Sequence, residues 1–237
     1  QKIKGRLQVL SDMLHGGADL KGCIGLGHTR WATHGAPSDV NSHPHMSEGG
    51  KFAVIHNGII ENYQEIKYRL INNHGIQFKS ETDTEVIAHL ISVYYEGDLL
   101  KAVNKAVSEM RGAYAIAAIA AAEPDKLIAV RKDAPLIVGL GDGFNFVASD
   151  IPAILKYTRD VYLIENNETV VLTKDSAVIL NEKNEPVARE VYTVDWDADA
   201  AEKDGYEHFM IKEIHEQPKA IRDTLGSVMK DGKIDLS

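Results

Sequence analysis

The feature that most constrains the fold is a series of short apolar segments in the second half of the chain. These segments are rich in β-branched and aromatic residues and are separated by turn-forming residues, which is typical of strands. They are residues 113–120, 126–130, 136–139, 144–148, 161–164, 169–172 and 177–180. Gly141-Asp142-Gly143 and Glu165-Asn166-Asn167 are expected to form tight connections between them.

Helical periodicity appears on both sides of this series, together with two further apolar runs. Helices are predicted over residues 1–14, 61–73, 84–95, 98–110 and 205–225, and strands over residues 24–32 and 52–56. The turn signal Asn57-Gly58 should end the second of these strands. Ser80-Glu81-Thr82-Asp83 matches a capping box at the start of a helix. Because helices and strands do not alternate regularly, we expect α+β layers rather than a parallel doubly wound sheet.

Charge and composition exclude several classes of protein. The formal net charge of −9 disfavours a nucleic-acid partner, because an acidic surface repels phosphates. No apolar run approaches the roughly 18 residues that span a bilayer, and no signal segment opens the chain. The single cysteine, Cys23, cannot form an intrachain disulfide and is expected to be a small buried apolar residue. A cytoplasmic location is predicted, with no membrane partner.

Polar residues that could bind a ligand or take part in catalysis are concentrated near the beginning of the chain. Residues 27–35, 41–45 and 56–62 contain five of the ten histidines. Loops that follow strands often carry binding groups, so this region is the candidate site.

Three interpretations of this region compete. His34, His43 and His45 could supply nitrogen ligands to a metal, although the nearby carboxylates lack a recognisable ligand spacing. The same polar residues could instead satisfy buried backbone groups in a structural cluster. The third interpretation is a site for an anion and an amide.

The anion and amide interpretation depends on five hydrogen-bond donors. Arg30 offers a guanidinium fork for a carboxylate, and Thr33 and His34 add donors nearby. The side chain of Asn57 and the backbone N–H of Gly58 could converge on a developing oxyanion.

The order of the motifs resembles the glutaminase domain of the glutamine–fructose-6-phosphate aminotransferases, also called glucosamine-6-phosphate synthases. The resemblance covers nearly the whole chain. It is carried by residues 29–35 (TRWATHG), 41–45 (NSHPH), 56–62 (HNGIIEN), 80–85 (SETDTE), 111–115 (RGAYA), 148–150 (ASD) and 208–218 (HFMIKEIHEQP). The first and last of these distinguish this family from other class II glutamine amidotransferases.

The resemblance implies an N-terminal-nucleophile hydrolase fold, which is a four-layer αββα sandwich. In this family an N-terminal cysteine attacks the side-chain amide of glutamine, its own α-amine acts as the base, and a glutamyl thioester forms. Ammonia passes to a sugar isomerase domain that makes glucosamine 6-phosphate from fructose 6-phosphate. The implied ligands are glutamine and glutamate, with no cofactor and no metal. A homodimer is implied for the full-length protein.

Site residues are carried over from the resemblance by position. Arg30 would bind the α-carboxylate of glutamine, and Asp83 would accept from its α-ammonium group. Asn57 and Gly58 would form the oxyanion hole as the catalytic pair. Thr33 and His34 would line the glutamine pocket, with Trp31 either near the ammonia path or in the core. His43, His45 and His56 are interpreted as structural partners.

The chain departs from the family pattern at the nucleophile, because its sequence does not include the N-terminal cysteine. Cys23 cannot replace it, since it lies inside the chain and has no free α-amine. We therefore expect residues 1–225 to be a glutaminase domain truncated at its N-terminus and inactive by itself. Residues 226–237 would begin a linker toward a missing isomerase domain. A non-catalytic glutamine-binding module of the same fold is the alternative, and a histidine-ligated metal hydrolase is a third hypothesis.

Overall fold

The computed structural model describes residues 1–31, 33–195, 204–230 and 233–234. The chain forms two compact units, Gln1–Thr193 and Val194–Ser237, and each is considered by itself. These units do not test the predicted boundary between domain and linker at residue 225, which stays a prediction.

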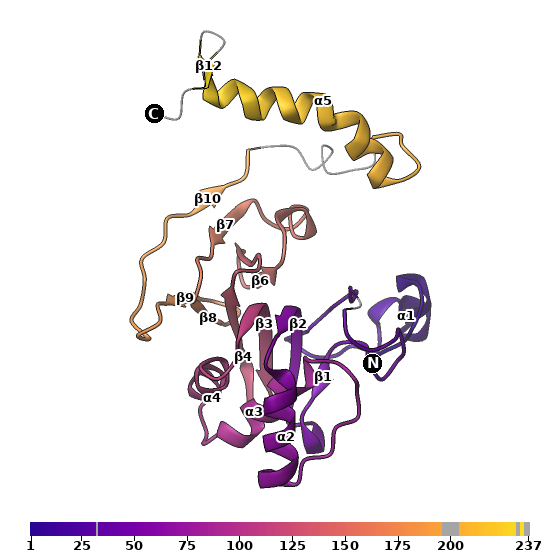
Figure 1. The fold of residues 1–237 in the computed structure, drawn as a ribbon, viewed down its shortest axis with the longest axis vertical. Helices are drawn as coiled ribbons and strands as arrows, with labels where there is room; N and C mark the ends of the chain where they lie inside the picture. The colour runs from indigo at the N-terminus through magenta and orange to yellow at the C-terminus, as the bar shows by residue number, and fades with distance from the viewer. Residues whose placement is uncertain (32, 196–203, 231–232, 235–237) are drawn as a thin grey trace. The chain divides into compact units, whose positions relative to one another are not determined.

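The helices follow the apolar periodicity closely (Figure 1). They are α1 (Leu7–Met13), α2 (Tyr63–His74), α3 (Glu85–Tyr94), α4 (Leu99–Val107) and α5 (Phe209–Val228), with 3₁₀ turns η1 (His15–Gly17), η2 (Glu48–Gly50) and η3 (Ile151–Ala153). Helix α2 ends where predicted, because its C-cap Gly75 adopts a left-handed conformation with φ of 68°. The helix predicted over residues 1–14 is shorter than expected, since α1 begins only at Leu7.

Two antiparallel sheets form the centre of the first unit. One sheet has the strand order β1-β2-β3-β4-β8-β9 and the other β10-β7-β5-β6. The strands are β1 (His45–Met46), β2 (Phe52–Ile60), β3 (Gly112–Ala120), β4 (Glu123–Lys132), β5 (Ile137–Leu140), β6 (Asn145–Ala148), β7 (Asp160–Leu163), β8 (Thr169–Leu172), β9 (Ala177–Leu180) and β10 (Tyr192–Thr193). Every strand predicted between residues 113 and 180 is confirmed within a few residues. The second unit adds the short pair β11 (Met229–Lys230) and β12 (Lys233–Ile234).

Side chains on β3 alternate between two hydrophobic cores, as the period of two in a strand requires. Ile116 and Ala118 contribute to the core that also contains the buried residues of α2, α3 and α4. Ala115 and Ala117 contribute to the core shared with Val138 of the second sheet. The helices therefore pack on one face of the first sheet, and the second sheet packs on its other face. Strands β2 and β3 are thus covered on both faces.

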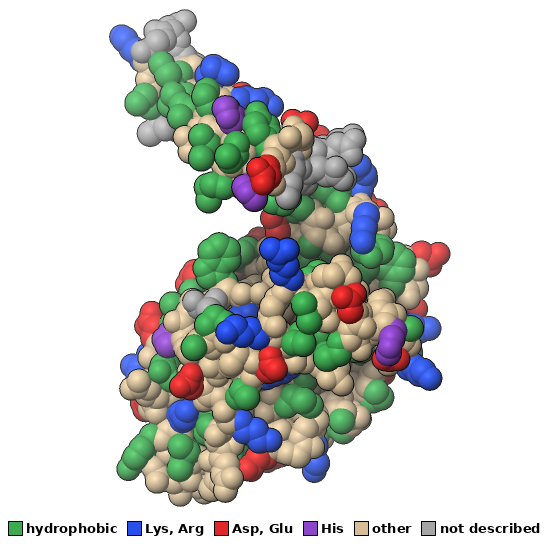
Figure 2. Space-filling model, turned by 90° about the vertical axis from the view of Figure 1, so that its right-hand side faces the viewer, with side chains coloured by type: hydrophobic (Ala, Val, Ile, Leu, Met, Phe, Trp, Pro, Cys, Tyr) green, Lys and Arg blue, Asp and Glu red, His purple; other side chains and the backbone are tan. Residues whose placement is uncertain are grey.

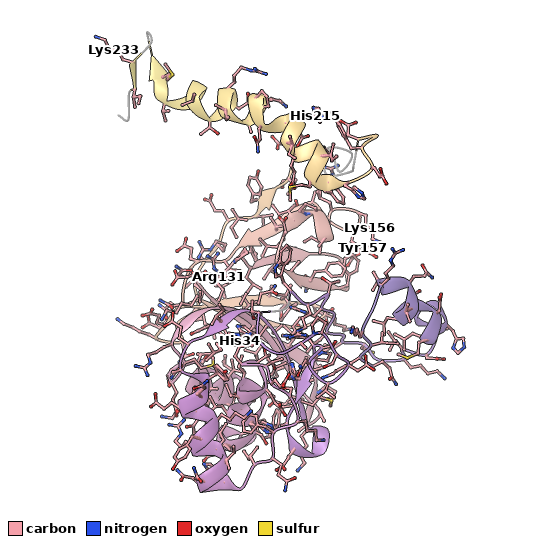
Figure 3. All side chains as sticks on the ribbon, turned by 45° about the vertical axis from the view of Figure 1, so that its right-hand side comes forward. His34, Arg131, Lys156, Tyr157, His215 and Lys233 are labelled. Atoms are coloured by element: carbon pink, nitrogen blue, oxygen red, sulfur yellow. The ribbon has the colours of Figure 1, made fainter. Side chains whose placement is uncertain are left out.

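The outer face of the second sheet is covered by residues 151–158, which include η3. Ile154 and Leu155 are buried there. A Cβ added to Gly139 of β5 would lie 2.4 Å from Ile154 Cδ1, so this segment lies directly against the strand. The ring of Tyr157, labelled in Figure 3, lies 5.2 Å from that of Phe146 in β6. This segment occupies the position of the fourth layer in the predicted αββα order.

Residues 24–31 do not form the predicted buried strand. Ile24 and Leu26 still pack against the core between the sheets, but the segment has no ladder partner among the described residues. Its glycines at positions 25 and 27 supply no side chains, which weakens a strand. Cys23 is exposed rather than buried, so that prediction was also wrong.

Asn57-Gly58 does not end a strand, since β2 continues through it to Ile60. Gly58 has φ of +120°, and a Cβ there would lie 2.0 Å from the carbonyl oxygen of Ala113 on β3. The glycine therefore allows β2 and β3 to approach each other closely, and it does not form the predicted turn.

The predicted capping box at Ser80 to Asp83 was wrong as well. Helix α3 begins at Glu85, and its N-cap residue Thr84 makes no side-chain cap. The Glu85 carboxylate instead accepts from the backbone N–H groups of Lys79 and Ser80 and from the Ser80 hydroxyl. Burial opposes ionisation of Glu85, but a hydrogen bond with the His89 ring, together with those from Ser80 and Lys79, lowers its pKa to about 2.

Helix α5 of the second unit carries many exposed apolar side chains, visible as a green surface in Figure 2. They are Phe209, Met210, Ile211, Ile214, Ile221 and Leu225. None of the described helices is long and apolar enough to cross a membrane.

Candidate active site

A cavity of about 340 Å³ opens where residues 28–34, β2 and the turn before α3 meet. Its lining includes every residue that the sequence singled out for a catalytic or substrate-binding role. The lining residues are His28, Arg30, Trp31, Thr33, His34, His43, His56, Asn57, Gly58, Ile59, Thr82, Asp83 and Thr84. Their place in the lining does not by itself test the roles predicted for them.

Arg30 organises the loop on one side of the cavity. Its Nη2 donates to the carbonyl oxygens of His34 at 2.6 Å and Gly35 at 2.8 Å, and its Nη1 donates to Ala36 at 3.3 Å. Arg30 itself adopts φ of 43°, an uncommon conformation for a residue with a side chain. A guanidinium has five N–H donors, so these three bonds leave capacity for a carboxylate.

The loop around Arg30 is tied to the rest of the domain through Asn41. The Asn41 Nδ2 group donates to Ala36 O and to a Glu81 carboxylate oxygen, each at 3.0 Å. The Glu81 backbone N–H donates back to Asn41 Oδ1 at 3.0 Å. His34, labelled in Figure 3, lies edge-on to the ring of Tyr63 at the start of α2.

Asp83 also lines the cavity, in the turn that precedes α3. Its side chain is buried, and Oδ2 accepts from the backbone N–H of Ile60 at 2.8 Å. One carboxylate oxygen thus fixes the turn to the end of β2. The carboxylate lines the cavity and can accept a further hydrogen bond from a ligand.

The backbone of β2 directs alternate N–H groups toward the cavity. His56 N donates to the His43 ring at 3.3 Å, and Ile60 N donates to Asp83, so both point away from β3. Glu61 N points the other way and donates to Arg111 O beside β3. Because N–H direction alternates along a strand, Gly58 N–H lies on the same side as those of His56 and Ile60. Asn57, exposed beside it, brings a second amide donor to the cavity.

Three buried, neutral histidines, His43, His45 and His56, lie beside the cavity. Burial, reinforced by the neighbouring imidazoles, lowers the pKa of His43 to about 2. Burial likewise lowers the pKa of His45 and of His56 to about 4. The rings contact one another, with His43 and His45 edge-on at 5.0 Å between centroids. One nitrogen of His45 binds Thr82 Oγ1, and Nδ1 of His56 binds Thr84 Oγ1, whereas His56 Nε2 is buried without a hydrogen-bond partner among the described residues.

This arrangement does not favour the metal hypothesis. In the described ranges, no three His, Cys, Asp or Glu side chains are grouped so that they could hold one metal ion. His43 and His45 direct ring nitrogens at a backbone amide and a hydroxyl, as the structural interpretation predicted.

Sequence reasoning gave no role to several lining residues. Thr82 and Thr84 belong to the quoted motif at residues 80–85, and His28 belongs to the candidate region 27–35, but none of the three was given a role. The concentration of histidines could have drawn attention to His28. The two threonines lie beside Asp83, and only the fold shows that this turn faces β2. Trp31, by contrast, is 91% exposed, which excludes the second of its two predicted alternatives, a place in the core.

Comparison with known proteins adds independent evidence to this geometry. The model of the glutamine amidotransferase domain family matches residues 28–156, which contain the whole cavity lining. Curated relatives named glutamine–fructose-6-phosphate aminotransferase (isomerizing) match nearly all of the chain. The protein from Clostridium tetani is 56% identical over 98% of this chain, and that from Thermus thermophilus is 48% identical over 99%. The chain spans only 38% and 39% of the length of these two relatives.

Solved structures agree on the fold. Glutamine phosphoribosylpyrophosphate amidotransferase from B. subtilis superposes with a TM-score of 0.55 at 24% identity, covering 67% of this chain and 35% of its own. A structure described as the allosteric regulatory enzyme of purine biosynthesis also gives 0.55, at 25% identity, covering 65% and 34%. The predicted N-terminal-nucleophile hydrolase fold is confirmed by these neighbours. The cavity, the family model and the relatives together show that the chain belongs to the glutamine amidotransferase domain family.

Proposed function

We propose that this chain is the glutamine-hydrolysing domain of a glutamine–fructose-6-phosphate aminotransferase. The observation that carries the proposal is one cavity lined by a guanidinium, a carboxylate and an amide pair on β2, in a chain 56% identical to a relative of that name. Glutamine has the complementary groups, namely an α-carboxylate, an α-ammonium and a side-chain amide.

Each end of the cavity suits one end of glutamine. Arg30 would bind the α-carboxylate with its remaining N–H donors. Asp83 would accept from the α-ammonium group at the same end of the ligand, and Thr33 and His34 would line the glutamine pocket. The carbonyl oxygen of the side-chain amide would then lie between Asn57 Nδ2 and the Gly58 N–H. Trp31, exposed at the rim, would lie near the path by which ammonia leaves.

The chemistry requires a nucleophile that these 237 residues do not supply. The resemblance assigns it to an N-terminal cysteine of the whole protein, whose α-amine takes the thiol proton. The thiolate attacks the amide carbon, and the charge on oxygen is stabilised by Asn57 and Gly58. The C–N bond then breaks, the amine gives its proton to the departing ammonia, and water later hydrolyses the thioester to glutamate. No step in this scheme uses a cofactor.

The whole protein would use this ammonia in a sugar isomerase domain, making glucosamine 6-phosphate from fructose 6-phosphate. The support is that the relatives are glutamine–fructose-6-phosphate aminotransferases and that this chain spans only 38% of their length. The expected homodimer stays a prediction.

Two substitutions in the full-length protein test the assignment by their opposite kinetic effects on glutamate release. Asn57→Ala should lower kcat by roughly 10²–10³ with little change in KM, because the oxyanion exists only in the transition state. Arg30→Ala should raise the glutamine KM far more than it lowers kcat, because the carboxylate contact exists in both states.

Arg111→Ala is a suitable control, since that arginine makes an exposed ion pair with Glu65 outside the cavity. An unchanged glutamine KM in Arg30→Ala would contradict the assignment. Glutamine binding without any turnover in the wild-type protein would support the non-catalytic module instead.

A further inference from the structure

His28 makes the contact that fixes the side chain of Asn57. Its Nε2 lies 2.8 Å from Asn57 Oδ1, and its Nδ1 accepts from the backbone N–H of Arg30 at 2.8 Å. The imidazole thereby connects the loop that carries Arg30 to the strand that carries Asn57. Neither the family match nor the names of the relatives assigns a role to this residue.

The two contacts together determine which nitrogen of His28 carries the proton. A backbone N–H can only donate, so Nδ1 must be the acceptor and must be unprotonated. The neutral ring therefore carries its proton on Nε2, which donates to Asn57. Burial lowers the pKa of His28, although its hydrogen bonds with the Asn57 side chain and the His56 backbone oppose the shift; the Arg30 charge adds a smaller lowering. The neutral form agrees with the geometry.

The tautomer of His28 in turn determines the orientation of the Asn57 amide. Because Nε2 donates, the atom of Asn57 that faces it must be the oxygen. The Nδ2 group of Asn57 then points away from His28 on the side chain that lines the cavity. It would present two N–H donors to an oxyanion, whereas the flipped amide would present its oxygen and repel the developing charge.

The ring of His28 is itself held in place. It stacks on His43 with 4.1 Å between centroids and 15° between planes. His43 is fixed in turn, because its Nδ1 accepts from the backbone N–H of His56 on β2. This connection runs from the rigid sheet through two neutral imidazoles to the Asn57 amide.

We infer that His28 is a positioning residue for the oxyanion hole, holding Asn57 with its amide N–H groups toward the substrate. This inference rests on the proposed function. His28 also lines the cavity, and the role inferred for it is to act through Asn57. It would act on kcat only by preventing rotation of the amide about χ2 of Asn57.

A pair of substitutions separates the two nitrogens of His28. In His28→Gln the terminal amide reaches the position of Nε2 and can still donate to Asn57. In His28→Asn the shorter side chain reaches the position of Nδ1 and can accept from Arg30 N but cannot reach Asn57. In the full-length protein, His28→Asn should lower kcat for glutamate release by about 10- to 100-fold, with glutamine KM within about threefold. His28→Gln should retain kcat within about threefold.

A double-mutant cycle gives the readout that a merely structural role would not produce. In an Asn57→Ala background there is no amide to orient, so His28→Asn should cause no further loss of kcat. His74→Asn makes the same chemical change at an exposed position at the end of α2 and should leave kcat unchanged.

The outcomes distinguish the inference from the proposed function. A wild-type protein that releases no glutamate from glutamine would refute the proposed function. An active wild type with unchanged kcat in His28→Asn, or with multiplicative losses in the double variant, would overturn the inference alone. Equal losses and raised KM in both His28→Asn and His28→Gln would likewise overturn it, because they would indicate a general structural role.

Discussion

The two sides of the candidate site are built in different ways. Asn57, Gly58 and Asp83 lie on β2 and on the turn before α3, between buried residues such as Ile60 and Val86. Arg30, Trp31 and His34 lie on a segment without regular structure, held mainly by side-chain hydrogen bonds. We refer to these as the strand side and the loop side.

The difference has an energetic consequence. On the strand side, the ladder with β3 and two packed faces fix the backbone, so a change in shape there costs free energy of folding. On the loop side, the positions depend on the bonds of Arg30 to its own loop and on the Asn41–Glu81 contact. Substitutions on the strand side should therefore affect stability, and substitutions on the loop side should affect binding of the substrate.

The largest effect is expected for Gly58→Ala on the strand side. The new Cβ would lie 2.0 Å from Ala113 O and 2.9 Å from Tyr114 Cα, at φ of +120°. Because both obstacles are backbone atoms of a central strand, neither can move without disturbing the sheet. The free energy of unfolding should fall by at least about 3 kcal/mol, measured by urea denaturation.

Gly75→Ala is the matched control for this substitution. Gly75 also has a positive φ, but a Cβ there would have nothing within 4 Å. It should therefore cost only about 1 kcal/mol, the strain of a left-handed residue without a clash. Equal losses in the two variants would show that the close approach to β3 is not what constrains the strand side.

The sequence predicted the two sides unequally. The period of two along residues 113–120 sets the two faces of β3, and β3 fixes the register of β2 from Phe52↔Ala120 to Ile60↔Gly112. Asn57-Gly58 was misread as a turn because a local signal cannot show that Ala113 lies 2.0 Å from a would-be Cβ. Asp83 was misread as a cap because its partner, Ile60 N, is 23 residues away. Residues 24–31 were misread because an apolar run does not reveal whether a ladder partner exists.

The second prediction concerns the histidines at the junction of the two sides. His43, His45 and His56 are buried and neutral, with pKa values lowered to about 2, 4 and 4. In the unfolded chain they take up protons below about pH 6.5, whereas in the folded chain they do not. Stability should therefore be complete above pH 6.5 and should decrease as the pH falls toward 4. We expect a loss of at least about 2 kcal/mol between pH 7 and pH 5, from urea denaturation followed by circular dichroism.

The choice of pH range isolates the buried imidazoles from the carboxylates, with His28, whose pKa is also lowered, contributing in the same direction. The lowered pKa of Glu85 affects stability only below its ordinary value, outside the interval from pH 7 to pH 5. His45→Gln, which keeps a donor for Thr82, should reduce the pH dependence, and the exposed His74→Gln should leave it intact. A stability that does not change between pH 7 and pH 5 would mean that the junction is hydrated rather than dry.

The smallest effect is expected for Trp31→Ala on the loop side. An exposed fraction of 91% means that the indole contributes almost no burial, so the free energy of unfolding should change by less than about 0.5 kcal/mol. Phe52→Ala on β2 is the aromatic counterpart on the strand side, where the ring is buried against Tyr95. It should cost about 3–5 kcal/mol. Any change in glutamine KM caused by Trp31→Ala could then be attributed to contact with the substrate, because the fold would be unaffected. If Trp31→Ala instead removed more than about 1 kcal/mol, the loop side would be held by packing, and the distinction between the two sides would fail.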